Sequence, residues 1–331
     1  MCLPQNGKET PEAIRPSPVS PLVRIFSFIC LLALWIPNAL ADPVSELASF
    51  SVFDKVDLAQ LRKDDAKPVR GGSSGSARYL SVQTVYVAPL PPAELLAKMR
   101  GWNPTRHPEL KIYLHVDSAT NFSRLQNAPD NSAVRYLVNA TLQRSSDLQL
   151  SAAEMKLLPG ENFASTWTKI LSGRAQTAIS SQPPYDNATP PVRPEEELNG
   201  LFHSQEKIRR QFAGLLPGGK SEMYWELQNV DEQGVLTLGA YSSRTGAGGT
   251  IQTVNTLYYA SSGYYAGITL QQLWPVQVEG RASTLVWRGD MISSASVASL
   301  HGIERIAAES TMIKDISRVV SFFRRDIVSA R

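Results

Sequence analysis

The sequence predicts an α+β fold in which a mainly antiparallel sheet packs against one long C-terminal helix. Strand-like segments follow one another from Glu222 to Met291, and the gaps between them are too short for helical crossovers. The chain then ends in an amphipathic helix, about Gly302 to Val328, whose apolar stripe needs a partner. The sheet provides that partner, because a domain buries its apolar faces between packed layers.

The first 41 residues have the features of a secretory signal peptide. The apolar run Ile25–Ile36 follows a basic residue, and an A-x-A cleavage site ends at Ala41. The run is shorter than the roughly 20 apolar residues that span a bilayer. We therefore expect residues 1–41 to be removed and the protein to be exported to the periplasm or the extracellular space. A long proline-rich segment precedes the run, which leaves Met1 and Val23 as alternative starts.

Composition excludes several classes of protein. Both cysteines, Cys2 and Cys30, lie in the leader, so the mature chain has no disulfide framework and no thiolate chemistry. The formal net charge is +3, with acidic and basic residues interspersed, so nucleic acid is not an expected partner. The mature chain has no second long apolar run, so no transmembrane segment is expected in it. Three sequons, at Asn121, Asn139 and Asn187, carry no conclusion.

The first half of the mature chain alternates short helices and strands. Strands are indicated by β-branched and aromatic residues, and a proline suits the first turn of a helix. Residues 42–76 form a helical lead-in and a Gly/Ser linker. In chain order we expect helical pieces within 44–61, the linker over 70–76, a strand over 79–87, a helix from Pro92 to Gly101, and strands over 111–116 and 135–142.

A large insertion, about 143–221, precedes the last strands. Ser151 and Glu154 form a capping box for a short helix that ends at Leu158, and a further helix is expected over 163–172. Residues 182–197 hold five prolines and several acidic residues, so we expect an exposed loop there.

The second half consists of strands and the terminal helix. The strands are expected over 222–230, 235–241, 250–260, 264–273 and 282–291, with a hairpin turn at 231–234. On the helix, apolar residues recur at three- and four-residue steps, so we expect Ile306, Ile313, Ile316, Val320 and Phe323 to be buried against the sheet. Arg318, Arg324 and Arg325 are expected in water.

This order of elements resembles the START-like, or Bet v 1-like, helix-grip fold. Ala88–Leu96 after the first strand, and the loop Trp102–Leu110 that leads to the second, are similar to the opening of some bacterial START-like proteins. WNPTRHPELKIYLH and LVWRGDMIS are also similar to segments of uncharacterised secreted bacterial proteins, which imply no activity. The resemblance covers about Tyr79 to Arg331. It implies a single START-like domain over 77–331, whose sheet and long helix enclose an apolar cavity for lipids or other hydrophobic ligands.

Motifs with known chemistry are scarce. No pair of histidines has a metal-ligand spacing, no G-x-S-x-G elbow is present, and the turn Gly246–Gly249 lacks the Lys-Ser/Thr of a phosphate loop, so neither metal nor cofactor is expected. His107 is a candidate general base with Asp117 or Glu109 as its orienter, although a lone loop histidine is more often a surface hydrogen-bonding group. Arg288-Gly289-Asp290 lies in an expected strand, where an Arg–Asp pair or a bulge at the glycine is favoured over adhesion.

Three functions remain open. The first is binding of a hydrophobic or amphipathic small molecule, such as a lipid, in a cavity between the sheet and the C-terminal helix; ordinary core packing is the alternative role of the same rings. The candidate ligand-binding residues are Trp225, Tyr258, Tyr265, Trp274 and Trp287. The second is an enzyme with a site in the Trp102–Glu109 loop, built from Trp102, Arg106, His107 and Glu109. The third is a non-enzymatic scaffold of the cell envelope.

Overall fold

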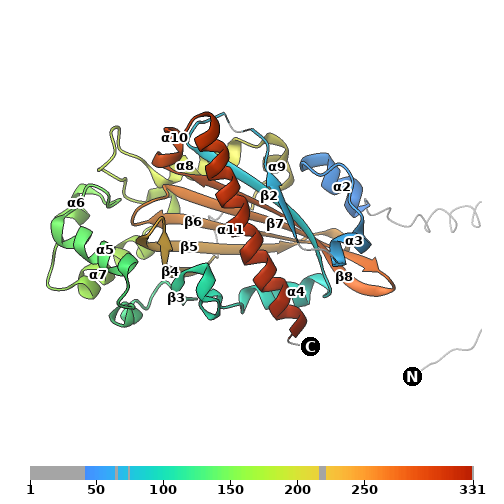
Figure 1. Ribbon diagram of the computed structural model, residues 1–331, viewed down its shortest axis with the longest axis horizontal. Helices are drawn as coiled ribbons and strands as arrows, with labels where there is room; N and C mark the ends of the chain where they lie inside the picture. Colours follow the sequence, from blue (N-terminus) through green and yellow to red (C-terminus); the bar gives the residue numbers. More distant parts are fainter. Residues whose placement is uncertain (1–41, 64–65, 74, 216–220, 330–331) are drawn as a thin grey trace, which may run out of the picture. The chain divides into compact units, whose positions relative to one another are not determined.

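The computed structural model describes residues 42–63, 66–73, 75–215 and 221–329. The fold is α+β, with an eight-stranded antiparallel sheet and a long C-terminal helix that passes in front of it (Figure 1). The expected signal peptide, its cleavage site and the two alternative starts lie outside the described residues. Among the residues that are described, no helix combines the length and the apolar character needed to cross a membrane.

The sheet has the strand order β1-β2-β8-β7-β6-β5-β4-β3. Strands β4 to β8 form a meander, β3 pairs with the outer side of β4, and β2 pairs with β8. The strands are β1 (Lys67–Arg70), β2 (Tyr79–Ala88), β3 (Ile112–Val116), β4 (Glu222–Val230), β5 (Gln233–Thr245), β6 (Ile251–Ala260), β7 (Ala266–Val278) and β8 (Arg281–Ser293). The β4–β5 turn has positive φ at Asp231 and Glu232, which matches the twist of a tight hairpin.

Helices cover both faces of the sheet. The helices are α2 (Pro43–Phe50), α3 (Leu58–Lys63), α4 (Pro92–Arg100), α5 (Ser132–Gln143), α6 (Ala152–Met155), α7 (Phe163–Gln176), α8 (Pro194–His203), α9 (Glu206–Gln211), α10 (Ala295–Ala298) and α11 (Gly302–Ser329). Helices α2, α5, α7, α8 and α9 share a large apolar core with one face, which we call the insertion face. Helices α4 and α11 share a smaller core with the other, the α11 face.

Side-chain alternation along the strands divides residues between the two faces. In β4, Trp225 and Leu227 are fully buried in the insertion-face core, whereas Tyr224 and Glu226 line a cavity on the α11 face. The α11 face therefore carries many polar residues at its centre, and the insertion face holds the larger apolar core.

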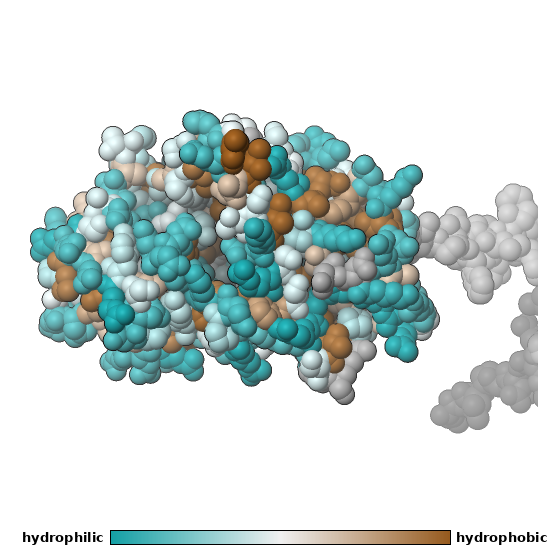
Figure 2. Space-filling view, viewed as in Figure 1, coloured by the Kyte–Doolittle hydropathy of each residue, from teal (hydrophilic) through white to brown (hydrophobic). Residues whose placement is uncertain are grey.

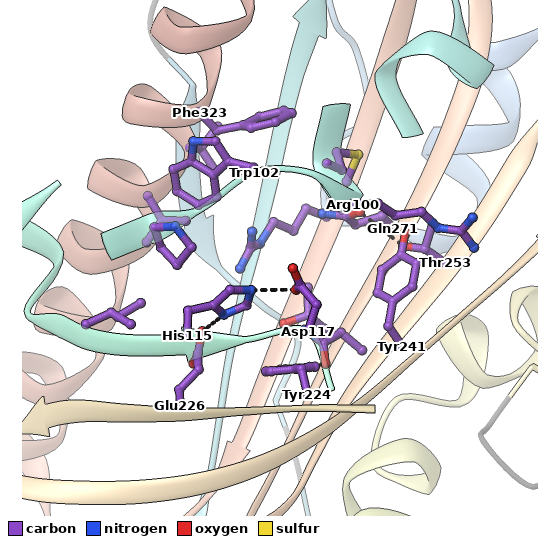
Figure 3. A pocket seen from close by; sticks show the side chains of 18 of the residues that line it. Arg100, Trp102, His115, Asp117, Tyr224, Glu226, Tyr241, Thr253, Gln271 and Phe323 are labelled. Carbon is purple, nitrogen blue, oxygen red and sulfur yellow. Dashed lines mark hydrogen bonds and ion pairs between the residues drawn. The ribbon is translucent and has the colours of Figure 1, made fainter. Parts of the chain in front are cut away.

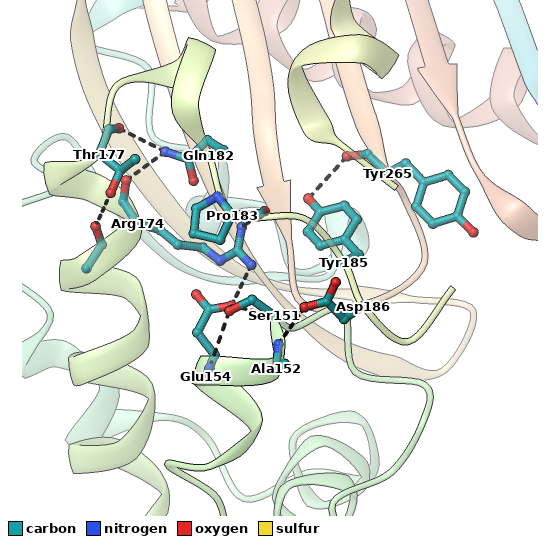
Figure 4. Close-up of polar contacts among 11 residues, drawn as sticks. Ser151, Ala152, Glu154, Arg174, Thr177, Gln182, Pro183, Tyr185, Asp186 and Tyr265 are labelled. Carbon is teal, nitrogen blue, oxygen red and sulfur yellow. Dashed lines mark hydrogen bonds and ion pairs between the residues drawn. The ribbon is translucent and has the colours of Figure 1, made fainter. Parts of the chain in front are cut away.

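The insertion is a packed layer, held by a buried ion pair (Figure 4). The Arg174 side chain is fully buried, and its Nη2 donates to Glu154 Oε2 at 2.6 Å. Its guanidinium also lies 4.2 Å from the ring centroid of Tyr259 in β6, a cation–π contact that joins α7 to the sheet. The capping box of Ser151 and Glu154 is present as expected. The same glutamate thus caps α6 and pairs with Arg174.

Three local expectations were wrong. Residues 135–142 form part of helix α5, which Asn131 caps and whose buried positions, Ala133, Leu137 and Ala140 among them, follow a helical period rather than alternation. Residues 182–197 are not an exposed loop, because Tyr185 is fully buried, bridges to Val192, and α8 begins at Pro194. The linker over 70–76 follows a short strand, β1, that was not expected.

The terminal helix lies where it was expected, but the burial of some of its side chains differs from the expectation. Ile316, Val320, Phe323 and Ile327 are buried. Ile313 is only half-buried, and Ile306 is 51% exposed. The expectation that Arg324 lies in water was also wrong, because its Nη2 donates to the carbonyl oxygens of Leu61 and Arg62.

Candidate functional site

Two cavities lie between the sheet and α11. We call them the Trp102 cavity, with a volume of about 520 Å³, and the Tyr264 cavity, of about 580 Å³. They share four lining residues on the sheet, and we call the sheet surface that these residues form the floor. The shared residues are Tyr224, Asn255, Thr269 and Arg288. Figure 2 shows a hollow beside α11 on this side of the molecule.

The floor is built from two hydrogen-bonded groups whose residues come from four strands. Tyr224 Oη donates to Asn255 Oδ1 at 2.9 Å. Thr269 Oγ1 donates to Asp290 Oδ1 at 2.8 Å, and Arg288 binds the same carboxylate through Nε and Nη2, both at 2.7 Å. The Asp290 side chain is only 8% exposed. The Arg–Asp pair expected from the sequence is confirmed, and β8 keeps an unbroken register through Gly289, so it has no bulge there.

A glycine gives the floor its depth. Gly239 in β5 is directly opposite Tyr224 in β4, and a Cβ at residue 239 would overlap the Tyr224 ring. The ring therefore lies down on the sheet instead of standing up toward α11. Burial raises the pKa of the Tyr224 hydroxyl, so it remains protonated and can donate.

The wall of the Trp102 cavity contains an imidazole between two carboxylates (Figure 3). His115 Nδ1 lies 2.8 Å from Glu226 Oε1, and His115 Nε2 lies 2.8 Å from Asp117 Oδ1. Burial lowers the pKa of His115, but the hydrogen bonds and charges of Glu226 and Asp117 outweigh it, so the pKa is raised. The imidazolium form donates one hydrogen bond to each carboxylate. The cavity wall therefore contains two ionic hydrogen bonds.

The opposite wall is apolar and comes from α4, the following loop and α11. Trp102 and Phe323 meet edge to face, with ring centroids 5.6 Å apart, across the cavity from His115 (Figure 3). Met99, Val319 and Val320 add further apolar surface. The Trp102 cavity thus has a polar floor, one ionic wall and one apolar wall.

The loop after α4 is fastened to the terminal helix. Trp102 Nε1 donates to Asp326 Oδ2 at 2.8 Å, and His107 Nε2 lies 2.8 Å from the same oxygen. The His107 ring also stacks on Phe322, with centroids 4.4 Å apart. These contacts hold α11 over the sheet.

The four loop residues of the enzyme hypothesis do not converge on one pocket. Trp102 lines the cavity, His107 is engaged with Asp326, and Arg106 and Glu109 are exposed. Asp117, considered as an orienter of His107, is paired with His115 instead. The alternative role of His107 as a hydrogen-bonding group matches this geometry.

The five candidate ligand-binding rings lie away from both cavities. The structure places Trp225, Tyr258, Tyr265, Trp274 and Trp287 in the insertion-face core. Trp274 Nε1 donates to Glu46 of α2, and Trp287 Nε1 donates to Gln83. The rings were assigned to the wrong side because adjacent aromatic residues point to opposite faces, and the sequence does not say which face α11 covers.

Sequence reasoning missed most of the polar floor. Trp225 and Tyr224 are neighbours, so burial of the tryptophan on one face would have placed the tyrosine and Glu226 on the other. Their convergence with His115, Asn255 and Arg288 depends on strand pairing and register, for which a single sequence carries little signal.

Comparisons of the chain with protein-family models, with curated proteins and with solved structures find no match. The class of the protein is therefore defined by the fold and the cavities alone. It is an α+β protein whose antiparallel sheet has helices on both faces, with two cavities under its C-terminal helix. Within the described residues, no group of three or more His, Cys, Asp and Glu side chains could hold a metal ion.

Proposed function

We propose that this protein binds an amphipathic small molecule between the sheet and α11, in a helix-grip arrangement. The observation that carries the proposal is the Trp102 cavity, which has an apolar wall of helical residues above a polar, hydrogen-bonded floor. Its volume of about 520 Å³ lies within the range of ligand pockets, roughly 300–1,000 Å³. A ligand with one apolar and one polar side would satisfy both surfaces.

The position of the cavity supports binding rather than simple packing. The insertion face places most of the aromatic core, including Trp225 and Trp287, in tight contact with helices. The α11 face has a smaller core and leaves open volume over hydroxyl and amide groups. Polar side chains at the centre of a sheet are costly unless they are hydrogen-bonded or serve a ligand.

Native mass spectrometry of the protein purified from its own host tests the proposal. We expect a bound mass that denaturing conditions release. In Val319→Trp, a ring introduced on the cavity side of α11 should abolish the bound mass, because Val319 lines the cavity. Val328→Trp makes the same substitution at an exposed position of α11 and should retain it. No bound mass, together with no binding of an apolar dye, would rule the function out.

We also propose that the chain is exported, on the strength of its first 41 residues alone. Fractionation of bacterial cells that express the whole chain should recover a shortened protein outside the cytoplasm. Recovery of full-length protein in the cytoplasm would contradict this.

A further inference from the structure

Opposite charges are paired among the described residues that line the Trp102 cavity, but the Asp117–His115–Glu226 cluster keeps a net negative charge even when the imidazole is protonated. Arg100 Nη2 lies 3.1 Å from Glu222 Oε1, His115 lies between Asp117 and Glu226, and Arg288 forms a two-point pair with Asp290. The six charged residues that line the cavity are Arg100, His115, Asp117, Glu222, Glu226 and Arg288. Each of them has an opposite charge within 4 Å.

Among the described residues, the hydrogen-bonding groups left for a ligand are uncharged and include two amides and the hydroxyl of Tyr241. Asn255 accepts from Tyr224 through Oδ1, and Gln271 accepts from Thr253 through Oε1 at 3.0 Å. Among the contacts of the described residues, neither Asn255 Nδ2 nor Gln271 Nε2 has a hydrogen-bond partner within the protein. Both amide groups are donors that line the floor, so they suit carbonyl, ether or hydroxyl oxygens.

We propose that the Trp102 cavity selects uncharged over anionic amphipathic ligands, with oxygen acceptors on one side and an apolar body on the other. The inference rests on the proposed function and specifies its ligand class. An anionic group that entered would lose its hydration, find Arg100 and Arg288 already paired, and face the excess negative charge of the Asp117–His115–Glu226 cluster. To find a partner it would have to break the ion pair of Arg100 or of Arg288, and this cost disfavours anions.

Two dyes that differ by one sulfonate test the selectivity. N-phenyl-1-naphthylamine is uncharged, and 8-anilinonaphthalene-1-sulfonate is its anionic counterpart. By fluorescence titration we expect the neutral dye to bind at least about tenfold more tightly, as one uncompensated charge in a pocket costs at least that factor. Val319→Trp should remove this binding and Val328→Trp should not, which localises the dye to the cavity.

Two charge variants distinguish an effect of ion pairing in the cavity from a simple preference for the more apolar dye. Glu222→Gln removes the partner of Arg100 at the cavity mouth, and at 62% exposure it does not endanger folding. It should tighten binding of the anionic dye at least about threefold relative to the neutral dye. Glu279→Gln changes the net charge equally, but Glu279 pairs with Lys63 on the surface and lines neither cavity. It should change neither dye.

The outcomes are distinct. Equal binding of the two dyes to the wild type, or equal effects of Glu222→Gln and Glu279→Gln, overturns the selectivity while ligand binding stands. Failure of the neutral dye to bind at the cavity overturns the selectivity and also counts against the proposed function.

Discussion

The two faces of the sheet have opposite compositions, although the same strands build both. On the insertion face, Trp274 and Trp287 pack with Phe50 and Phe212, and Trp225 packs with Phe122, in a core that has almost no exposure. On the α11 face, the central positions are Tyr224, Asn255 and Arg288, and open volume lies above them. The difference fits the function proposed above, in which one face stabilises the fold and the other binds the ligand.

This division is testable because adjacent residues of one strand belong to different faces. A substitution on the insertion face should cost stability, and one on the α11 face should cost mainly ligand binding. The four predictions below compare the two faces, beginning with the largest expected effect.

Trp225→Ala should lower the free energy of unfolding by about 3–5 kcal/mol, because it empties a fully buried site. Tyr224→Phe, one residue away, should cost only about 1 kcal/mol, since it removes the hydroxyl that bonds to Asn255. Urea denaturation of both variants measures the difference. Similar losses for the two would mean that both faces contribute equally to stability.

Arg174→Met should cost about 3–5 kcal/mol, because it leaves the Glu154 carboxylate, only 12% exposed, without its partner. Arg100→Met on the α11 face should cost about 0–1 kcal/mol, because Arg100 and Glu222 are 41% and 62% exposed and water screens the pair. Thermal and chemical denaturation provide the comparison. A large loss for Arg100→Met would show that the cavity mouth is part of the stabilising core.

Phe323→Ala should cost about 3 kcal/mol, the lower end of the range for a buried phenylalanine, because one side of the ring faces the cavity. Ile306→Ala on the same helix should be within about 0.5 kcal/mol of wild type, because Ile306 is largely exposed. Arg324→Ala should cost about 1 kcal/mol through its bonds to Leu61 and Arg62. Equal effects at Phe323 and Ile306 would mean that α11 is not held by the sheet.

The smallest effect expected is a pH dependence that comes from His115. Its pKa is raised above the ordinary 6.5, so the folded state binds this proton more tightly than the unfolded state does. The resulting stabilisation is complete below pH 6.5 and is lost as the pH rises through the folded-state pKa. Urea denaturation on either side of that window should show the loss in wild type, and His115→Gln should reduce it. An unchanged pH profile in the variant would assign the dependence to another group.

The sequence predicted the strands of the meander and the terminal helix well, because alternation, turn residues and helical periodicity are local signals. It failed at 135–142, where Tyr136 and Val138 suggest a strand but the buried positions Ala133, Leu137 and Ala140 follow a helix. Propensity was overridden there by packing against β5.

The candidate site could not be predicted to the same extent. Adjacent rings such as Tyr224 and Trp225 indicate two faces but not which of them α11 covers. That choice depends on long-range contacts, including those of Trp102 and His107 with Asp326, which are separated by more than two hundred residues. The Arg288–Asp290 pair was predictable because both residues lie on one strand, two positions apart.

The Tyr224 ring lies over Gly239, which has no side chain. The size of residue 239 therefore sets the depth of the cavity. A single methyl group at residue 239 would act as a wedge beneath the phenol and lift it toward α11. The volume of the cavity thus depends on a residue that lies beneath the Tyr224 ring and that no ligand would contact. Chains that share this sheet could be adapted to smaller or larger molecules by changing that one position, with every polar group of the floor retained.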